Sequence, residues 1–293
     1  MHLDLRHLGE EYLQERLPFI CELAKAYVNV DPAKEPIPIR PTVHYTMGGI
    51  ETNGQCETRI QGLFAVGECA SVGLHGANRL GSNSLAEFVV FGRVAGEQAV
   101  ERAKAFKGWD DAAIAQQVEA VEARIAALMN QEGDENWAEI RTEMGHTMEA
   151  GCGIYRQEDL MQATLDKIAE LKQRYKKISI KDKGKVFNTD LLYAIEVGYG
   201  LEVAEAMVHS AILRKESRGA HQRLDDGCTE RDDVNFLKHS LAFFQEDNAP
   251  SIDYSDVKIT KSQPKARLYG EAAEKAAAAE AKASQDNSAE EQA

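Results

Sequence analysis

The sequence has little that would indicate a metal centre or a disulfide framework. Only five cysteines occur among 293 residues, at positions 21, 56, 69, 152 and 228, and no two of them form a C-x-x-C pair. An odd and scattered set of this kind predicts neither disulfides nor the ligands of a zinc ion or an iron–sulfur cluster. It also indicates a reducing compartment.

Long apolar runs, export signals and basic stripes are missing as well. No run approaches the ~20 apolar residues that a membrane span needs, so no direct membrane span is expected. The N-terminus lacks the pattern of a signal peptide. The net charge is −14, and without a basic stripe to offset it, nucleic acid is not expected as a partner.

What is present is the composition of a soluble globular protein, with 43% hydrophobic and 28% charged residues. The most informative stretch runs from His44 to Glu97. It carries a hairpin signal at Asn53-Gly54, then a short apolar run at 63–66 that predicts a buried strand. After a loop rich in Gly, Ser and Asn, the residues 84–87 (S-L-A-E) predict a capping box and the start of a helix.

This order of strand, acidic residue, glycine loop and helix indicates a ligand site. Glycines at 73, 76 and 81 let the backbone approach a partner closely. The helix start near Ser84 favours negative charge, and Glu68, at the end of the predicted strand, could accept hydrogen bonds from ribityl or ribose hydroxyls. Arg79 lies in a small, neutral loop without a local carboxylate, and its guanidinium suits a planar carboxylate ligand. An ordinary strand–helix loop explains each feature alone but not all of them together.

The rest of the chain is predicted to be mainly helical. Helices are expected at about 9–27, 111–130, 135–151, 157–177 and 187–214, with Leu160, Leu165, Ile168 and Leu171 on one face of the fourth. Four of the seven prolines fall in 31–43, which predicts an extended connector. Strands are expected at 241–244 and 257–260. Beyond residue 270 no apolar side chain is larger than alanine, so this tail is predicted to be disordered or a frayed helix.

Several segments resemble one enzyme family in order and spacing. HYTMGGIET, GLFAVGE, GLHGANRLGSNSL, KESRGAH and RDDVNFLKH are similar to the flavoprotein subunit of fumarate reductase and succinate dehydrogenase, and most similar to its bacterial fumarate reductase branch. The resemblance extends from near Leu3 to about Tyr269. It does not include the family's N-terminal half with its G-x-G-x-x-G fingerprint, flavin-linked histidine and proton-donating arginine. We therefore expect a C-terminal fragment that is inactive alone and contains no catalytic residue.

The resemblance implies FAD as cofactor and an interconversion of fumarate and succinate by hydride transfer. It implies that His44 and Arg79 bind the substrate, that Glu68, Ser84 and Leu85 contact the flavin, and that no residue binds a metal. The implied partners are an iron–sulfur subunit and membrane anchor subunits, which would hold the protein peripherally at the cytoplasmic face of the inner membrane.

The implied fold class is α/β plus α. The C-terminal part of an FAD-binding Rossmann-like domain is followed by a helical bundle domain and a small C-terminal α+β region. The expected division is a remnant of the capping domain and connector (1–41), the FAD-binding segment (42–103), the bundle (104–220), the α+β region (221–269) and the tail (270–293).

Two other functions stay open at this point. L-aspartate oxidase shares the fold and an E-S-R-G-x-H segment, although the HYTMGG stretch and the RDDVNFLKH extension argue against it. A non-catalytic fragment that docks an iron–sulfur subunit is the second. The charges of the ESRGAH segment, residues 216–221, are predicted to be structural, as part of a solvated or interface network.

Overall fold

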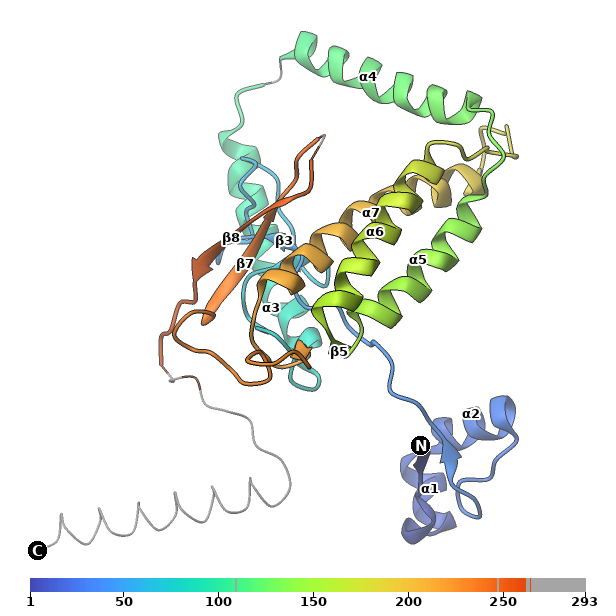
Figure 1. Cartoon of the computed structure of the whole chain (residues 1–293). Coiled ribbons are helices and arrows are strands. Elements are labelled where there is room, and N and C mark those ends of the chain that lie inside the picture. The colour runs from blue at the N-terminus through green and yellow to red at the C-terminus, as the bar shows by residue number, and fades with distance from the viewer. Residues whose placement is uncertain (109, 247, 262–263, 265–293) are drawn as a thin grey trace, which may run out of the picture. The chain divides into compact units, whose positions relative to one another are not determined.

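The structure is a computed structural model that describes residues 1–108, 110–246, 248–261 and 264 (Figure 1). The described helices and strands fall in the first of two compact units, Met1–Tyr254, except for the end of the last strand. The helices are α1 (Glu10–Arg16), α2 (Pro18–Val28), α3 (Asn83–Ala105), α4 (Asp111–Asn130), α5 (Trp137–Cys152), α6 (Glu158–Tyr175) and α7 (Thr189–Leu213), with a 3-10 turn at Arg6–Leu8. The predicted tail at 270–293 lies outside the described residues.

The hydrophobic core lies among α5, α6 and α7, which run side by side in Figure 1. Helix α7 contributes small and branched side chains at helical spacing, namely Ala194, Val197, Leu201, Ala204, Val208 and Ala211. Helix α6 buries Leu165, Ile168 and Leu171 as predicted, whereas Leu160 is 44% exposed and lies off that face. The buried side chains of α7 form a wide apolar stripe, as expected for a helix that packs on two neighbouring helices.

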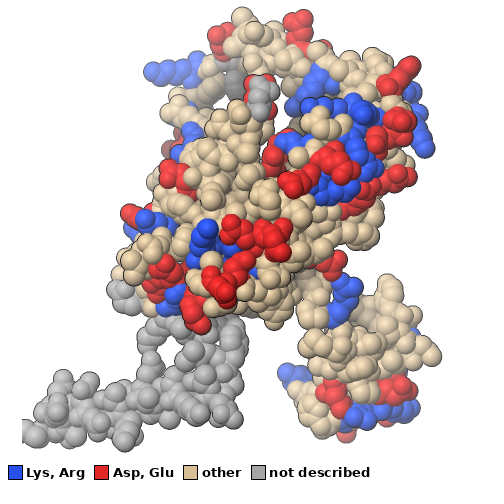
Figure 2. Space-filling view, in the orientation of Figure 1, with Lys and Arg blue, Asp and Glu red and all other residues tan. Residues whose placement is uncertain are grey.

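Charged side chains surround this core and join the helices. Lys172 of α6 pairs with Glu202 and Glu205 of α7, at 2.9 Å each. Arg174 reaches Glu135 at 3.0 Å and Glu143 of α5 at 2.8 Å. The face shown in Figure 2 accordingly has basic and acidic side chains interspersed. These side chains are partly buried but still reached by solvent. Ion pairs that solvent screens contribute little individually, so the apolar contacts hold the bundle together.

The predicted helix boundaries are correct within a few residues for α4 to α7, and α4 has the predicted bounds. The first predicted helix, 9–27, is wrong because it is two helices that meet at Leu17. Pro18 is the first residue of α2, and a proline ring cannot donate the hydrogen bond that an unbroken helix would need there.

Within the residues that the structure describes, the strands form four two-stranded sheets. The pairs are β1 (His2–Leu3) with β2 (Ile37–Pro38), β3 (Ile50–Glu51) with β4 (Ala70–Ser71), β5 (Tyr155–Arg156) with β6 (Gln222–Arg223), and β7 (Lys238–Phe243) with β8 (Ser251–Asp256). The first pair is antiparallel, and the next two are parallel. Strand β2 lies inside the predicted connector, which is otherwise irregular as expected.

Two predicted strands are wrong. The run 63–66 forms a single bridge, Phe64 to Glu57, because no strand in the described part of the chain lies along the rest of it. The second C-terminal strand is Ser251–Asp256 and not 257–260. In this strand the ring of Tyr254 packs on Phe236, with centroids 6.0 Å apart. The turn at Asn53-Gly54 is confirmed, since the Asn53 side chain accepts the N–H groups of Gln55 and Glu57.

Candidate functional site

Arg79 lies on the ring of Tyr45 in the loop before α3. Its guanidinium carbon is 4.7 Å from the ring centroid, and Nη1 donates to the carbonyl of Leu80 at 3.2 Å. Its Nε is buried and has no hydrogen-bond partner among the residues that the structure describes. A buried donor without a partner costs free energy, so this arginine is suited to receive an acceptor from a ligand.

His44 is exposed, and its neighbour Tyr45 provides the contact with Arg79. The two residues predicted to bind substrate are 35 positions apart in the sequence, and Tyr45 thus brings the His44 segment to the Arg79 loop. Burial, with the nearby carboxylate of Glu87, raises the pKa of the Tyr45 hydroxyl. Tyr45 is therefore a neutral aromatic support at neutral pH.

A buried pair, His75 and Glu87, lies behind this tyrosine. The Glu87 carboxylate accepts from Nε2 of His75 at 2.5 Å, and Glu87 is only 4% exposed. The His75 ring meets the Tyr45 ring edge-on, with centroids 5.7 Å apart. The Tyr45 hydroxyl is 3.5 Å from the same carboxylate. The pair therefore holds the tyrosine on which Arg79 lies.

The position of Glu87 corrects the predicted capping box. Helix α3 starts at Asn83, and its N-cap is Ser82, which has a left-handed backbone and no capping hydrogen bond from its side chain. Ser84 is thus inside the first turn, and Glu87 points to His75 and not back to the cap. A glutamate that finds a buried partner gains more than one that bonds an exposed backbone N–H.

The remaining predicted cofactor residues lie near the start of α3 or before β4. Glu68 is exposed and accepts the N–H of Thr46 at 2.9 Å, which leaves acceptor capacity on its carboxylate. The N–H of Leu85 already donates to the Ser82 carbonyl at 3.1 Å, and the Leu85 side chain is 65% exposed. An exposed acceptor, an unpaired arginine donor and the positive end of a helix fit a ligand that has hydroxyl groups and negative charge.

Two family models match the chain. One, described as "FAD binding domain", matches residues 1–85, which include the loop of Arg79 and the start of α3. The other, described as "Fumarate reductase flavoprotein C-term", matches residues 141–269, which include α6 and α7. The first match thus includes the glycine loop and the second includes the helical core. The two models follow one another along the chain in the order that the resemblance predicts.

The similar proteins agree with these matches. The fumarate reductase flavoprotein subunit of Proteus vulgaris is 69% identical over 92% of this chain and 45% of its own length. That of Escherichia coli (strain K12) is 68% identical over 96% of this chain and 47% of its own. The chain is thus similar to the flavoprotein subunits of fumarate reductase.

The fold of this flavoprotein family is confirmed by a solved structure. A variant of E. coli quinol fumarate reductase FrdA matches with a TM-score of 0.88 and 70% identity, over 92% of this chain and 46% of that one. The chain spans about half the length of the curated relatives it matches. The predicted combination of helical and strand-containing flavoprotein regions is therefore correct, and the cofactor that the matches indicate is FAD.

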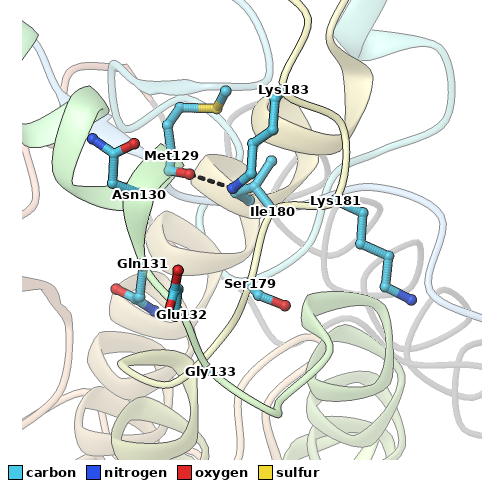
Figure 3. Close-up of a pocket in the computed structure, with 9 residues that line it drawn as sticks. All are labelled: Met129, Asn130, Gln131, Glu132, Gly133, Ser179, Ile180, Lys181 and Lys183. Carbon is cyan, nitrogen blue, oxygen red and sulfur yellow. Dashed lines mark hydrogen bonds between the residues drawn. The ribbon is translucent and has the colours of Figure 1, made fainter.

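A shallow cavity of about 660 Å³ lies away from these residues (Figure 3). Residues 129–133, at the C-terminal end of α4 and just beyond it, line it together with Ser179, Ile180, Lys181 and Lys183. Figure 3 shows Lys183 reaching the carbonyl of Met129, and Gln131 donates to the carbonyl of Ile178 at 2.8 Å. Part of the polar lining is thus used to join the two segments, and none of the five predicted site residues belongs to it.

The roles of Tyr45 and Glu87 were not predicted from the sequence. A signal was available, because Glu87 is the one acidic residue between Leu85 and Gly92, in an otherwise apolar segment. A charge in such a segment is commonly buried with a partner. The prediction for residues 216–221 was wrong in part: Glu216 is fully buried and His221 is 7% exposed, so this network is not solvated.

None of the helices in the described ranges has both the length and the apolar character needed to cross a membrane.

Proposed function

We propose that this chain is part of a fumarate reductase flavoprotein subunit that uses FAD to interconvert fumarate and succinate. The observation that carries the proposal is its 68% identity, over 96% of its length, to a fumarate reductase flavoprotein subunit. The glycine loop adds support, because it presents an arginine whose buried Nε lacks a partner in the described structure. An anionic dicarboxylate is the kind of ligand that such a group binds.

His44 and Arg79 would hold the substrate carboxylates. Arg79 offers a fork of donors that suits a planar carboxylate, and its guanidinium lies on the Tyr45 ring. His44 is exposed and adjoins the same tyrosine. Fixing both carboxylates orients the double bond and stabilises charge that develops on the substrate. No catalytic proton donor is assigned to this chain.

Glu68, Ser84 and Leu85 would hold the cofactor. When bound and reduced, FAD would supply hydride chemistry for one olefinic carbon of fumarate, with a proton going to the other carbon. The Glu68 carboxylate would accept from a hydroxyl of the cofactor, and the first turn of α3 would place its positive end beside the ring system. Leu85 would offer its exposed side chain as an apolar contact.

The domain division and the assembly are part of the same proposal. Residues 1–41 would be a capping-domain segment with its connector, 42–103 the FAD-binding segment, 104–220 the helical bundle and 221–269 the C-terminal region. An iron–sulfur subunit would supply electrons, and membrane anchor subunits would hold the complex at the cytoplasmic face of the inner membrane. A solved relative titled "Quinol-Fumarate Reductase with Menaquinol Molecules" supports quinol as the electron donor.

The test is turnover by a full-length flavoprotein that carries this sequence. With a reduced dye as electron donor, it should reduce fumarate rapidly and should not oxidise L-aspartate. Oxidation of L-aspartate without fumarate reduction would contradict the proposal and favour an L-aspartate oxidase. Capture of an iron–sulfur protein by a preparation without flavin absorbance or turnover would instead indicate a docking fragment.

A further inference from the structure

Residues 218–221 form a tight turn that touches the loop of Arg79. The N–H of Arg218 donates to the carbonyl of His221 at 2.8 Å, and the N–H of His221 donates back at 3.0 Å. Gly219 and Ala220 are therefore the two central residues of a hairpin turn. Gly219 has a φ of +58°, which a residue with a side chain rarely adopts at this position.

The tip of this turn lies directly against Ala77. The N–H of Ala220 donates to the Ala77 carbonyl at 3.0 Å. A Cβ at Gly219 would lie 2.8 Å from the Ala77 carbonyl carbon and oxygen. Ala77 is two residues before Arg79, so the turn contacts the backbone that carries the guanidinium. Glycine is required here both for its φ and for this close approach.

The turn itself is anchored in a buried network. The fully buried Glu216 accepts from Nε and Nη2 of Arg218, at 2.8 and 2.9 Å. It also accepts from Arg214 and from the N–H of Asp232. Four donors on one buried carboxylate satisfy its acceptor sites, so the glutamate has little freedom to move.

His221 fixes the other side of the turn. Its Nδ1 lies 2.8 Å from Nη1 of Arg156, and its Nε2 lies 2.9 Å from the carbonyl of Arg214. Because a guanidinium only donates and a carbonyl only accepts, the ring carries its proton on Nε2. The turn thus joins α7 and β5 to the loop of Arg79.

A second contact from the C-terminal region supports the same loop. A Cβ at Gly73 would lie 3.1 Å from two atoms of the His239 ring, on β7. The loop is therefore approached at Gly73 and at Ala77, while its other side contacts Tyr45. A loop held at these points has little freedom to change the orientation of Arg79.

We propose that residues 216–221 are a positioning element for Arg79. The turn contacts Ala77 and so fixes the loop that presents the guanidinium. The inference rests on the proposed function, because it assumes that Arg79 holds a substrate carboxylate. The ESRGAH segment would thus affect dicarboxylate affinity even though it lies far from Arg79 in the sequence.

The test compares two glycines in a full-length, FAD-loaded flavoprotein that carries this sequence. Gly219→Ala introduces both an unfavourable φ and a clash with Ala77. Gly227→Ala is the matched control, because Gly227 has a φ of +77° but nothing within 4 Å of its Cβ position. The dissociation constant of malonate, a dicarboxylate that cannot be reduced, is measured by titration of the flavin spectrum.

Gly219→Ala should weaken malonate binding by roughly tenfold to a hundredfold, as expected when a binding group is displaced. Gly227→Ala should bind as the wild type does, and the two variants should have similar flavin contents and melting temperatures. In an Arg79→Lys background, Gly219→Ala should have little further effect on malonate binding, because both changes act on one contact.

If Gly219→Ala does not fold, Arg218→Lys serves instead. It keeps the charge but loses the fork to Glu216, and should weaken binding several-fold.

Wild-type malonate affinity in Gly219→Ala, or in Arg218→Lys where that variant is used, would overturn the positioning role. So would additive losses in the Arg79→Lys background. If the wild-type protein bound FAD but no dicarboxylate, the proposed function itself would fail, and the positioning role would fail with it.

Discussion

At the scale of single residues, Arg223 shows how a buried charge can end a helix. Its Nη1 donates to the carbonyls of Ala211 and Ile212, at 3.1 Å each, where the last turn of α7 would leave them without partners. Its Nε donates to Asp225 at 2.5 Å. The guanidinium is almost fully buried, and its positive charge lies at the negative end of the helix dipole.

His221 makes stability depend on pH. Burial lowers the pKa of its imidazole from 6.5 to about 4. Between these values the unfolded chain binds a proton that the folded protein does not, so stability falls as the pH drops through this window and levels off below it. The contribution is roughly 3 kcal/mol over the whole window.

We expect the urea-unfolding free energy of the wild type to fall between pH 7 and pH 5 by more than that of His221→Gln. Glutamine can keep one donor and one acceptor but does not titrate. Burial also lowers the pKa of His239. The variant His239→Gln therefore tests how much of the remaining pH dependence of the unfolding free energy comes from His239. The same pH dependence in wild type and His221→Gln would show that His221 is not the titrating group.

Some site residues could be predicted from sequence and others could not. Arg79 was identified as a ligand-binding candidate because its loop contains no carboxylate, and its unpaired Nε agrees with that reasoning. Glu87 was misassigned because S-x-x-E before an apolar run fits a capping box equally well. Only the approach of His75, from the preceding loop, distinguishes the two. Local spacing does not contain that information.

At the scale of elements, helices were predictable and short strands were not. The starts of α4 and α7 follow from Asp110 and Asn188, whose side chains accept the first free N–H groups of each helix. These signals are local. Strands β5 and β6 are two residues each and pair across more than sixty positions of sequence. Their pairing depends on the packing of α6 and α7, which a local pattern does not specify.

The two caps give an element-scale prediction. Asn188→Ala should lower the unfolding free energy by about 1–2 kcal/mol, because it removes the bond to the Leu191 N–H at 2.8 Å in the helix that forms the core. Asp110→Ala removes an equivalent cap from α4, which buries none of its residues, so it should change the global value little. Equal losses in urea unfolding would mean that α4 is as much a part of the cooperative core as α7.

At the scale of the whole molecule, the chain spans about half the length of the relatives it matches. It contains no G-x-G-x-x-G segment after a strand, and such a segment is what binds the pyrophosphate of a dinucleotide. After reconstitution and gel filtration, we expect the 293-residue chain alone to retain little FAD and to show no fumarate reduction. Stoichiometric flavin absorbance in the protein peak would contradict this expectation.

The central claim is that Arg79 holds a substrate carboxylate, and kcat/KM for fumarate in Arg79 variants of a full-length flavoprotein tests it most directly. Arg79→Ala leaves a carboxylate charge unpaired, a loss of roughly 3 kcal/mol, so kcat/KM should fall at least about a hundredfold. Arg79→Lys keeps the charge but loses the fork, and it should also lose most activity. Flavin content should stay at the wild-type level in both variants. Near-wild-type turnover in Arg79→Lys, or loss of flavin in either variant, would contradict the account.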